Sequence, residues 1–195
     1  LRALPAPDAL DIALPPGYVC LVVDAGTQLA PELCRRLEAV GLTAVALSLP
    51  PADGGAASPP AEPDGVPEGL VLADLEEASI EEALRTVAER RGPVGALVYL
   101  HPRISADEAG ALVAAQDRAY VRTAFLMAKL VQPSLVEVAA VAWAGFMTVT
   151  RLDGALGLSG TSDFSVVGGG LAGLTKTLPL EWPAVACRAV DIAPD

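Results

Sequence analysis

Few residues of this chain combine the type and the position needed for chemistry, and the first of them lie in a turn near the amino terminus. The turn runs Asp24-Ala25-Gly26-Thr27-Gln28-Leu29-Ala30, between an apolar run and a helix-like segment. A dinucleotide site places several glycines in such a turn, so that backbone N–H groups can approach the pyrophosphate. This turn has one glycine, and Asp24 brings a negative charge where the phosphates would lie. It therefore predicts a plain turn, with a divergent nucleotide site as the alternative.

Other side chains with catalytic or metal-binding chemistry are scattered. His101 is the only histidine, which excludes a multi-histidine metal site, and Pro102 beside it favours a loop-shaping role. Three cysteines have neither metal-ligand spacing nor the density of a disulfide framework, which fits a reducing cytosol. Four glutamates near a helix start are better explained by the helix dipole than as paired carboxylates. These residues are Cys20, Cys34, Cys187, Glu76, Glu77, Glu81 and Glu82.

The composition describes a globular chain and excludes two classes of partner. Of 195 residues, 52% are hydrophobic, which is enough to bury a sizeable core in one domain. The formal net charge is -11, and such acidity would repel a nucleic-acid backbone. No apolar run approaches the length of about 18 residues that a membrane span needs. We expect a cytoplasmic protein that binds neither nucleic acid nor membrane.

Apolar runs alternate with amphipathic stretches along the chain, which predicts a parallel sheet covered by helices. We expect a long helix that ends at Pro133, because proline interrupts a helix interior. Six prolines and three glycines among residues 50–67 predict an irregular loop. The expected strands lie at 18–23, 43–49, 69–74, 94–100, within 135–150, and at 186–192, and the expected helices at 31–40, 79–91, 105–131 and within 163–182.

This pattern predicts an α/β fold of the Rossmann type, a truncated doubly wound parallel sheet flanked by helices. Residues 1–16, rich in proline, are expected to form a linker or edge segment, and residues 17–195 one structural unit. In such folds ligands bind at the carboxyl ends of the strands, where the strand order reverses.

The stretch from Phe164 to Leu178 resembles the active-site helix of short-chain dehydrogenases, which opens Tyr-x-x-x-Lys. Its small-residue continuation, Leu171-Ala172-Gly173-Leu174, carries the likeness. In that family the tyrosine protonates the substrate oxygen, while the lysine lowers its pKa and holds the nicotinamide ribose. The resemblance places the tyrosine at Phe164 and the lysine at Gly168. It implies that both functions are lost.

Further positions of the same family are also altered. The family's Asn-Asn-Ala-Gly run after the fourth strand corresponds to Tyr99-Leu100-His101-Pro102. The nearest candidates for its catalytic serine are Thr148 and Thr150. Asp74 matches the adenine-contacting aspartate in position, and one matching residue does not make a site. The resemblance therefore implies no catalytic, cofactor-binding or metal-binding residue in this chain.

Two later segments are similar to the structural subdomain of polyketide synthase ketoreductases. They are Leu178-Pro179-Leu180-Glu181-Trp182-Pro183 and Cys187-Arg188-Ala189-Val190-Asp191-Ile192. The ending Asp191-Ile192-Ala193-Pro194-Asp195 looks closest to polyunsaturated-fatty-acid-synthase-like enzymes. In this family the first, truncated half binds no cofactor. The second half binds NADPH and reduces a β-ketoacyl group held on an acyl carrier protein.

The resemblance implies that this chain is the non-catalytic half, inactive alone, and that its partner is the catalytic half in the same polypeptide. Three other functions remain open, one of them a nucleotide-binding sensor with an altered first turn. The chain could be a divergent reductase with its own activity, or a module that docks another synthase domain or a carrier protein. Docking an acidic carrier protein would need a local basic patch, for which Arg35, Arg36, Arg90 and Arg91 are the candidates.

Overall fold

The computed structural model of the chain describes residues 13–51, 69–102, 104, 115–159 and 164–193. The predicted segment 1–16 and the predicted loop 50–67 lie mostly outside these residues, as do positions 105–114 of the predicted long helix.

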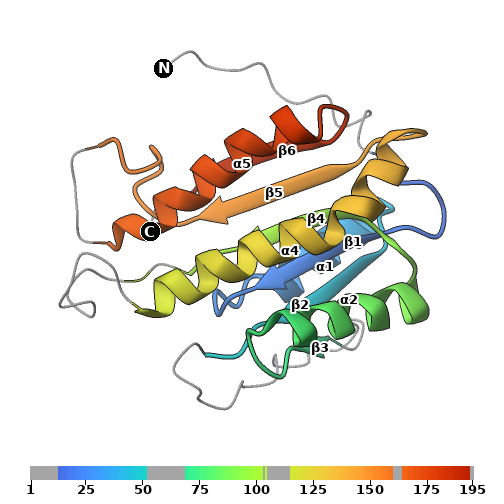
Figure 1. The fold of residues 1–195 in the computed structure, drawn as a ribbon, viewed down its shortest axis with the longest axis horizontal. Helices are drawn as coiled ribbons and strands as arrows, with labels where there is room; N and C mark the ends of the chain where they lie inside the picture. The colour runs from blue at the N-terminus through green and yellow to red at the C-terminus, as the bar shows by residue number, and fades with distance from the viewer. Residues whose placement is uncertain (1–12, 52–68, 103, 105–114, 160–163, 194–195) are drawn as a thin grey trace.

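A six-stranded parallel sheet forms the centre of the molecule, in the order β3-β2-β1-β4-β5-β6 (Figure 1). The order reverses between β1 and β4, so a crevice for ligands is expected at their carboxyl ends. The prediction of a doubly wound, Rossmann-like sheet is confirmed. The strands are β1 (Val19–Asp24), β2 (Ala44–Ser48), β3 (Leu70–Val71), β4 (Val94–Leu100), β5 (Gly145–Thr150) and β6 (Ala186–Asp191).

Helices cover the two faces of the sheet unequally. Helices α2, α4 and α5 pack on one face, and within the described residues α1 alone packs on the other (Figure 1). The helical elements are α1 (Ala30–Ala39), α2 (Glu77–Arg91), α4 (Ala115–Ala139), the 3₁₀ turn η2 (Val166–Gly168) and α5 (Gly169–Glu181).

The two faces follow from the alternation of side chains along each strand. On β1, Leu21 and Val23 belong to the core beneath α2, α4 and α5, whereas Val22 points to the α1 side. On the larger side Phe146 of β5 meets Trp182 edge to face, with ring centroids 6.1 Å apart. Burying each such side chain contributes about 1.5–3 kcal/mol, so most of the hydrophobic stabilisation lies on the three-helix face.

The prediction that Pro133 ends the long helix is wrong. Helix α4 continues through it to Ala139. The proline ring removes one hydrogen bond and costs about 3 kcal/mol in a helix interior. Leu135 and Val138, in the turn after it, are fully buried, and their burial offsets that cost. The same extension explains why β5 begins only at Gly145 and not near residue 135.

The third strand is shorter than predicted, because only Leu70 and Val71 pair with β2 at the edge of the sheet. No described helix is long and apolar enough to cross a membrane.

Candidate functional site

The carboxylate of Asp24 fills the turn between β1 and α1. It accepts hydrogen bonds from the backbone N–H groups of Gly26 (2.9 Å), Thr27 (2.6 Å) and Ala30 (3.1 Å). The Thr27 hydroxyl also donates to it, at 2.8 Å, and accepts from Leu29 N at 3.2 Å. Asp24 is only 5% exposed. An internal carboxylate therefore occupies two N–H donors of the turn and that of the first residue of α1.

This geometry decides how well the turn fits a dinucleotide. The first N–H groups of a helix point at the ligand, and the helix dipole favours negative charge there. Here the Asp24 carboxylate, which belongs to the chain itself, supplies both the hydrogen-bond acceptor and the negative charge. A pyrophosphate would have to displace a buried carboxylate and would be repelled by it. The residues present do not fit a pyrophosphate in the family's position.

A buried pair, His101 and Asp117, lies where β4 ends. His101 Nε2 is 2.7 Å from Asp117 Oδ1, and both side chains are almost completely buried. Neither His101 Nδ1 nor Asp117 Oδ2 has a partner among the described residues. Buried polar atoms are normally hydrogen-bonded, so this pair is the most unusual polar feature of the carboxyl edge.

Two tyrosines enclose the imidazole. The rings of Tyr99 and His101 are stacked, with centroids 6.5 Å apart, and Tyr120 meets the imidazole edge to face. The Tyr99 hydroxyl donates to the carbonyl oxygen of Tyr120 at 2.8 Å. Burial is the main cause that raises the pKa of Tyr99 well above its ordinary value. The neighbouring Tyr120, Asp117 and Asp24 raise it further. Tyr99 is therefore a neutral, fully buried member of the core and not an acid facing a cleft.

The structure places Gly168 next to the imidazole of this cluster. Phe164 is buried, and Gly168 ends the 3₁₀ turn η2. A Cβ atom at Gly168 would lie 3.3 Å from Leu152 Cδ2 and 3.5 Å from His101 Nε2. A side chain at position 168 would thus begin against the imidazole.

The two threonines of β5 are engaged in structural hydrogen bonds. Thr148 Oγ1 is 2.8 Å from Thr175 Oγ1 of α5, in the core and away from the carboxyl edge. Thr150 Oγ1 donates to Asp191 Oδ1 at 2.8 Å. Within the described residues, both hydroxyls are thus engaged in contacts that join β5 to α5 and to β6.

Asp191, at the end of β6, holds the loop that follows β5. Besides Thr150, its carboxylate accepts from the backbone N–H groups of Leu152 (2.8 Å), Asp153 (3.2 Å) and Leu156 (2.9 Å). The loop thus has a fixed conformation where the family places its catalytic serine.

Asp153 continues the same network within the loop. It accepts from the N–H groups of Ala155, Gly157 and Ser159, each at 2.8 Å. Hydrogen bonding, first from the Ser159 side chain, holds the pKa of Asp153 well below its ordinary value.

Asp74 and the glutamates of α2 have local roles. Asp74 is exposed and accepts from Glu76 N at 2.9 Å, and its hydrogen bond with the Ser79 side chain is the main cause of its lowered pKa. Glu77 pairs with Lys129 of α4 at 2.7 Å, and Glu82 with Arg85. Glu77 and Glu82 are therefore ion-pair partners on the surface.

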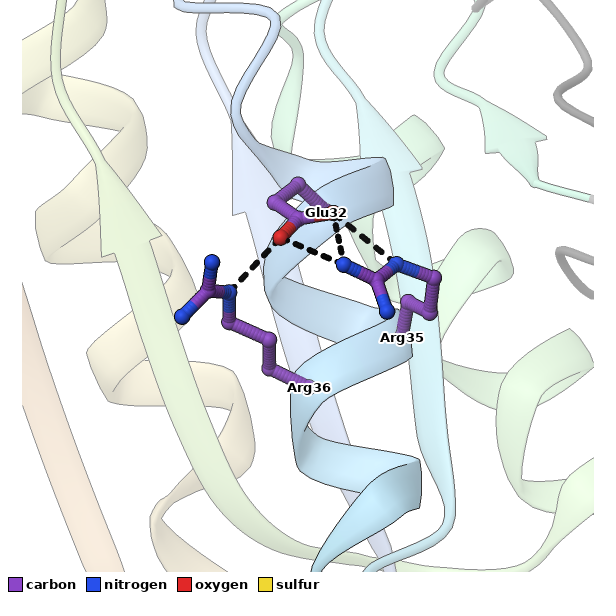
Figure 2. Close-up of polar contacts among 3 residues, drawn as sticks. All are labelled: Glu32, Arg35 and Arg36. Atoms are coloured by element: carbon purple, nitrogen blue, oxygen red, sulfur yellow. Dashed lines mark hydrogen bonds and ion pairs between the residues drawn. The ribbon is translucent and has the colours of Figure 1, made fainter.

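The four arginines considered as a basic patch do not gather on one face. Arg35 and Arg36 lie on α1, where both bind the carboxylate of Glu32 (Figure 2). Arg90 and Arg91 end α2, on the opposite side of the sheet (Figure 1). This placement removes the main support for a carrier-protein docking patch.

The cysteines are free and buried. Burial raises the pKa of the Cys20 thiol to about 12 and that of Cys34 to about 11. These groups are protonated at neutral pH and are poor nucleophiles. Within the described residues no cluster of three metal-ligating side chains occurs.

Sequence reasoning missed the two carboxylates that organise the edge. Asp117 lies inside an ordinary helical pattern, and only the fold brings it to His101. Asp191 belongs to the segment 187–192, whose resemblance to ketoreductases assigns it no structural role. A polar residue on an otherwise apolar helix face is a weak signal that could have identified Asp117.

Comparison with models of protein families finds no match, and neither does comparison with curated protein sequences. Comparison with solved structures finds many. The 3-ketoacyl-(acyl-carrier-protein) reductase of Brucella melitensis, solved with NADH, matches 91% of this chain over 76% of its own length, with 21% identity and a TM-score of 0.65. A short-chain dehydrogenase/reductase of Saccharomyces cerevisiae matches 90% of this chain over 70% of its length (12% identity, TM-score 0.62). The aldohexose dehydrogenase of Thermoplasma acidophilum matches 93% of this chain over 69% of its own length, with 12% identity and a TM-score of 0.60.

This chain has the fold of short-chain dehydrogenases/reductases. At these identities the likeness concerns the fold alone. The activities and the bound NADH belong to the proteins compared, and what they imply for this chain has to be argued from its own residues.

Proposed function

We propose that this chain is the non-catalytic structural half of a ketoreductase in a polyketide or fatty-acid synthase. In this role it packs on an NADPH-dependent half that reduces β-ketoacyl groups on an acyl carrier protein, and it holds no cofactor of its own. A partner that binds only the folded state stabilises it by mass action, and tethering in one polypeptide keeps its effective concentration high. A cytoplasmic location is part of the same proposal.

The observation that carries the proposal is the Asp24 carboxylate at the start of α1. It accepts from three backbone N–H groups of the turn where a pyrophosphate would bind, and its negative charge opposes that of the phosphates. Phe164 has no hydroxyl to donate, and Gly168, which lies against His101, has no charge to supply. Three separate positions therefore argue against reductase chemistry in this chain, while the fold supports a relationship to reductases.

The test is to titrate NADPH into this chain alone, and into this chain joined to the reductase half, by isothermal calorimetry with a parallel ketone-reduction assay. We expect no binding to the chain alone, and binding with reduction in the joined protein. Micromolar binding by the isolated chain would refute the proposal. A matched variant, Phe164→Tyr with Gly168→Lys, is expected to remain inactive alone, because the Asp24 turn is unchanged.

A further inference from the structure

Half of the α1 face of the sheet is uncovered in the described residues. Helix α1 packs over β1 and β2, and beside it the same face of β4, β5 and β6 forms the floor of a groove of about 770 Å³. The opposite face of these strands is covered by α4 and α5 (Figure 1). The groove is therefore the part of the sheet that, among the described residues, has helices on one face only, whereas β1 and β2 are covered on both faces.

The floor of the groove is apolar along its length. Leu100 of β4 lies beside Val149 of β5, and Val98 lies beside Met147. Nearer the amino ends, the neighbouring residues Ala96, Gly145 and Ala186 have little or no side chain. The indole of Trp143 lies against Gly145, where a Cβ atom would come within 2.5 Å of the ring. The indole therefore covers the sheet at this end and closes the groove, so the open floor is that formed by the larger side chains nearer the carboxyl ends.

The dimensions of the floor correspond to one α-helix. Strands are spaced about 4.8 Å apart, so the distance from β4 to β6 is about 10 Å, and a helix with its side chains is about 10–12 Å wide. The six residues of β5 extend for about 20 Å. A helix rising about 1.5 Å per residue covers that length with about 13 residues.

The rims of the groove carry positive charge, in contrast to the net charge of -11 of the chain. Arg36 extends from α1 toward β4, whereas Arg35 points away from it (Figure 2). Arg188 lies on the opposite rim, on β6, and is exposed. Glu32 compensates part of the charge of Arg36. A second copy of this acidic chain would be repelled as a whole, which favours a different partner with local acidic groups.

We propose that this groove is the docking site for one amphipathic helix of the catalytic half, about 13 residues long, with carboxylates facing Arg36 and Arg188. This inference rests on the proposed function and adds the surface and the chemistry of the contact. The apolar stripe of the helix covers Val98, Met147 and Val149, and its acidic flanks meet the two arginines. Charge pairs at such a rim select the partner and its orientation.

The two methionines of the chain provide a test that needs no mutation. Met147 lies on the groove floor and is partly exposed, whereas Met127 is on the face of α4 that packs into the core and is completely buried. Sulfoxide formation by dilute hydrogen peroxide is followed at both residues by mass spectrometry, in the chain alone and in the joined protein. We expect Met147 to be oxidised at least about tenfold more slowly in the joined protein. Met127 should be protected in both.

A charge exchange tests the acidic flanks. Arg188→Glu in the joined protein should restore oxidation of Met147, whereas Lys176→Glu, an exposed cation on α5, should not. Equal oxidation of Met147 in both proteins would overturn the inference, and the proposed function would survive if the joined protein still reduces ketones. Protection that rises with the concentration of the chain alone would assign the groove to a second copy and also overturn it. Equal effects of the two charge variants would refute the acidic flanks.

Discussion

Removing the Asp24 carboxylate should both destabilise the chain and open an anion site. In Asp24→Ala, four hydrogen bonds are lost. Gly26 is exposed and Thr27 partly so, and their N–H groups can bind water instead. The N–H of Ala30 is buried, and leaving it unsatisfied costs about 1–3 kcal/mol. The lost charge at the helix start adds about 1 kcal/mol, for a total of about 2–4 kcal/mol.

Thermal unfolding measures this loss. For a domain of this size, 1 kcal/mol corresponds to about 2–4 °C, so Tm should fall by about 5–15 °C. Asp74→Ala is the matched control, because its exposed carboxylate accepts one backbone bond at the start of α2. It should lower Tm by no more than about 1–4 °C.

Inorganic phosphate distinguishes an anion site from a simple loss of packing. At ten times its Kd, phosphate would stabilise Asp24→Ala by about 1.4 kcal/mol, or about 3–6 °C. The wild type should gain only the general effect of an excluded salt, measured against sodium chloride at equal ionic strength. If Tm decreased by less than about 2 °C in Asp24→Ala, or if phosphate stabilised both proteins equally, the reasoning would be refuted.

Three further outcomes are expected. Because breaking a buried pair leaves an uncompensated group, His101→Phe and Asp117→Leu should each lower the free energy of unfolding in urea by about 3–5 kcal/mol. The double variant should lose less than either single one, and additive losses would contradict the pairing. Because the pKa of Asp153 is lowered below its ordinary 3.8, its stabilisation is present above that pH and is lost as the pH falls. Tm should therefore decline more steeply below about pH 5 in the wild type than in Asp153→Asn, and parallel curves would argue against it. Finally, Cys20 and Cys34 should react with a disulfide reagent at pH 8 only on unfolding, since their pKa values lie near 12 and 11, and rapid labelling of the native chain would exclude this.

The sheet could be predicted from the sequence because its strands are short apolar runs whose burial needs no knowledge of their partners. The strand at Val94–Leu100 was located at its observed limits, since Pro93 and Pro102 bound it. The predicted end of the long helix is wrong because local propensity at Pro133 does not include the tertiary burial of Leu135. Such burial depends on which face meets the sheet.

The candidate site was only partly predictable for a similar reason. The effect of Asp24 on its turn is predictable from the sequence, because the N–H groups that bind its carboxylate lie within six residues of it. The contact between His101 and Asp117 joins residues 16 positions apart, on different elements. The space that His101 takes beside Gly168 depends on how two elements pack. No local pattern reports such distances.

The bond network of Asp191 bears on the order in which the molecule assembles. Thr150 and Asp191 are 41 positions apart, and a ribosome adds about 5–20 residues per second. The carboxylate of Asp191, which fixes the loop after β5, is therefore synthesised about 2–8 s after Thr150. During that interval β5 is an unpaired sheet edge, open to pairing with another nascent chain. Pairing with β6 thus removes this exposed edge of β5 during synthesis, and shortening the delay should reduce aggregation.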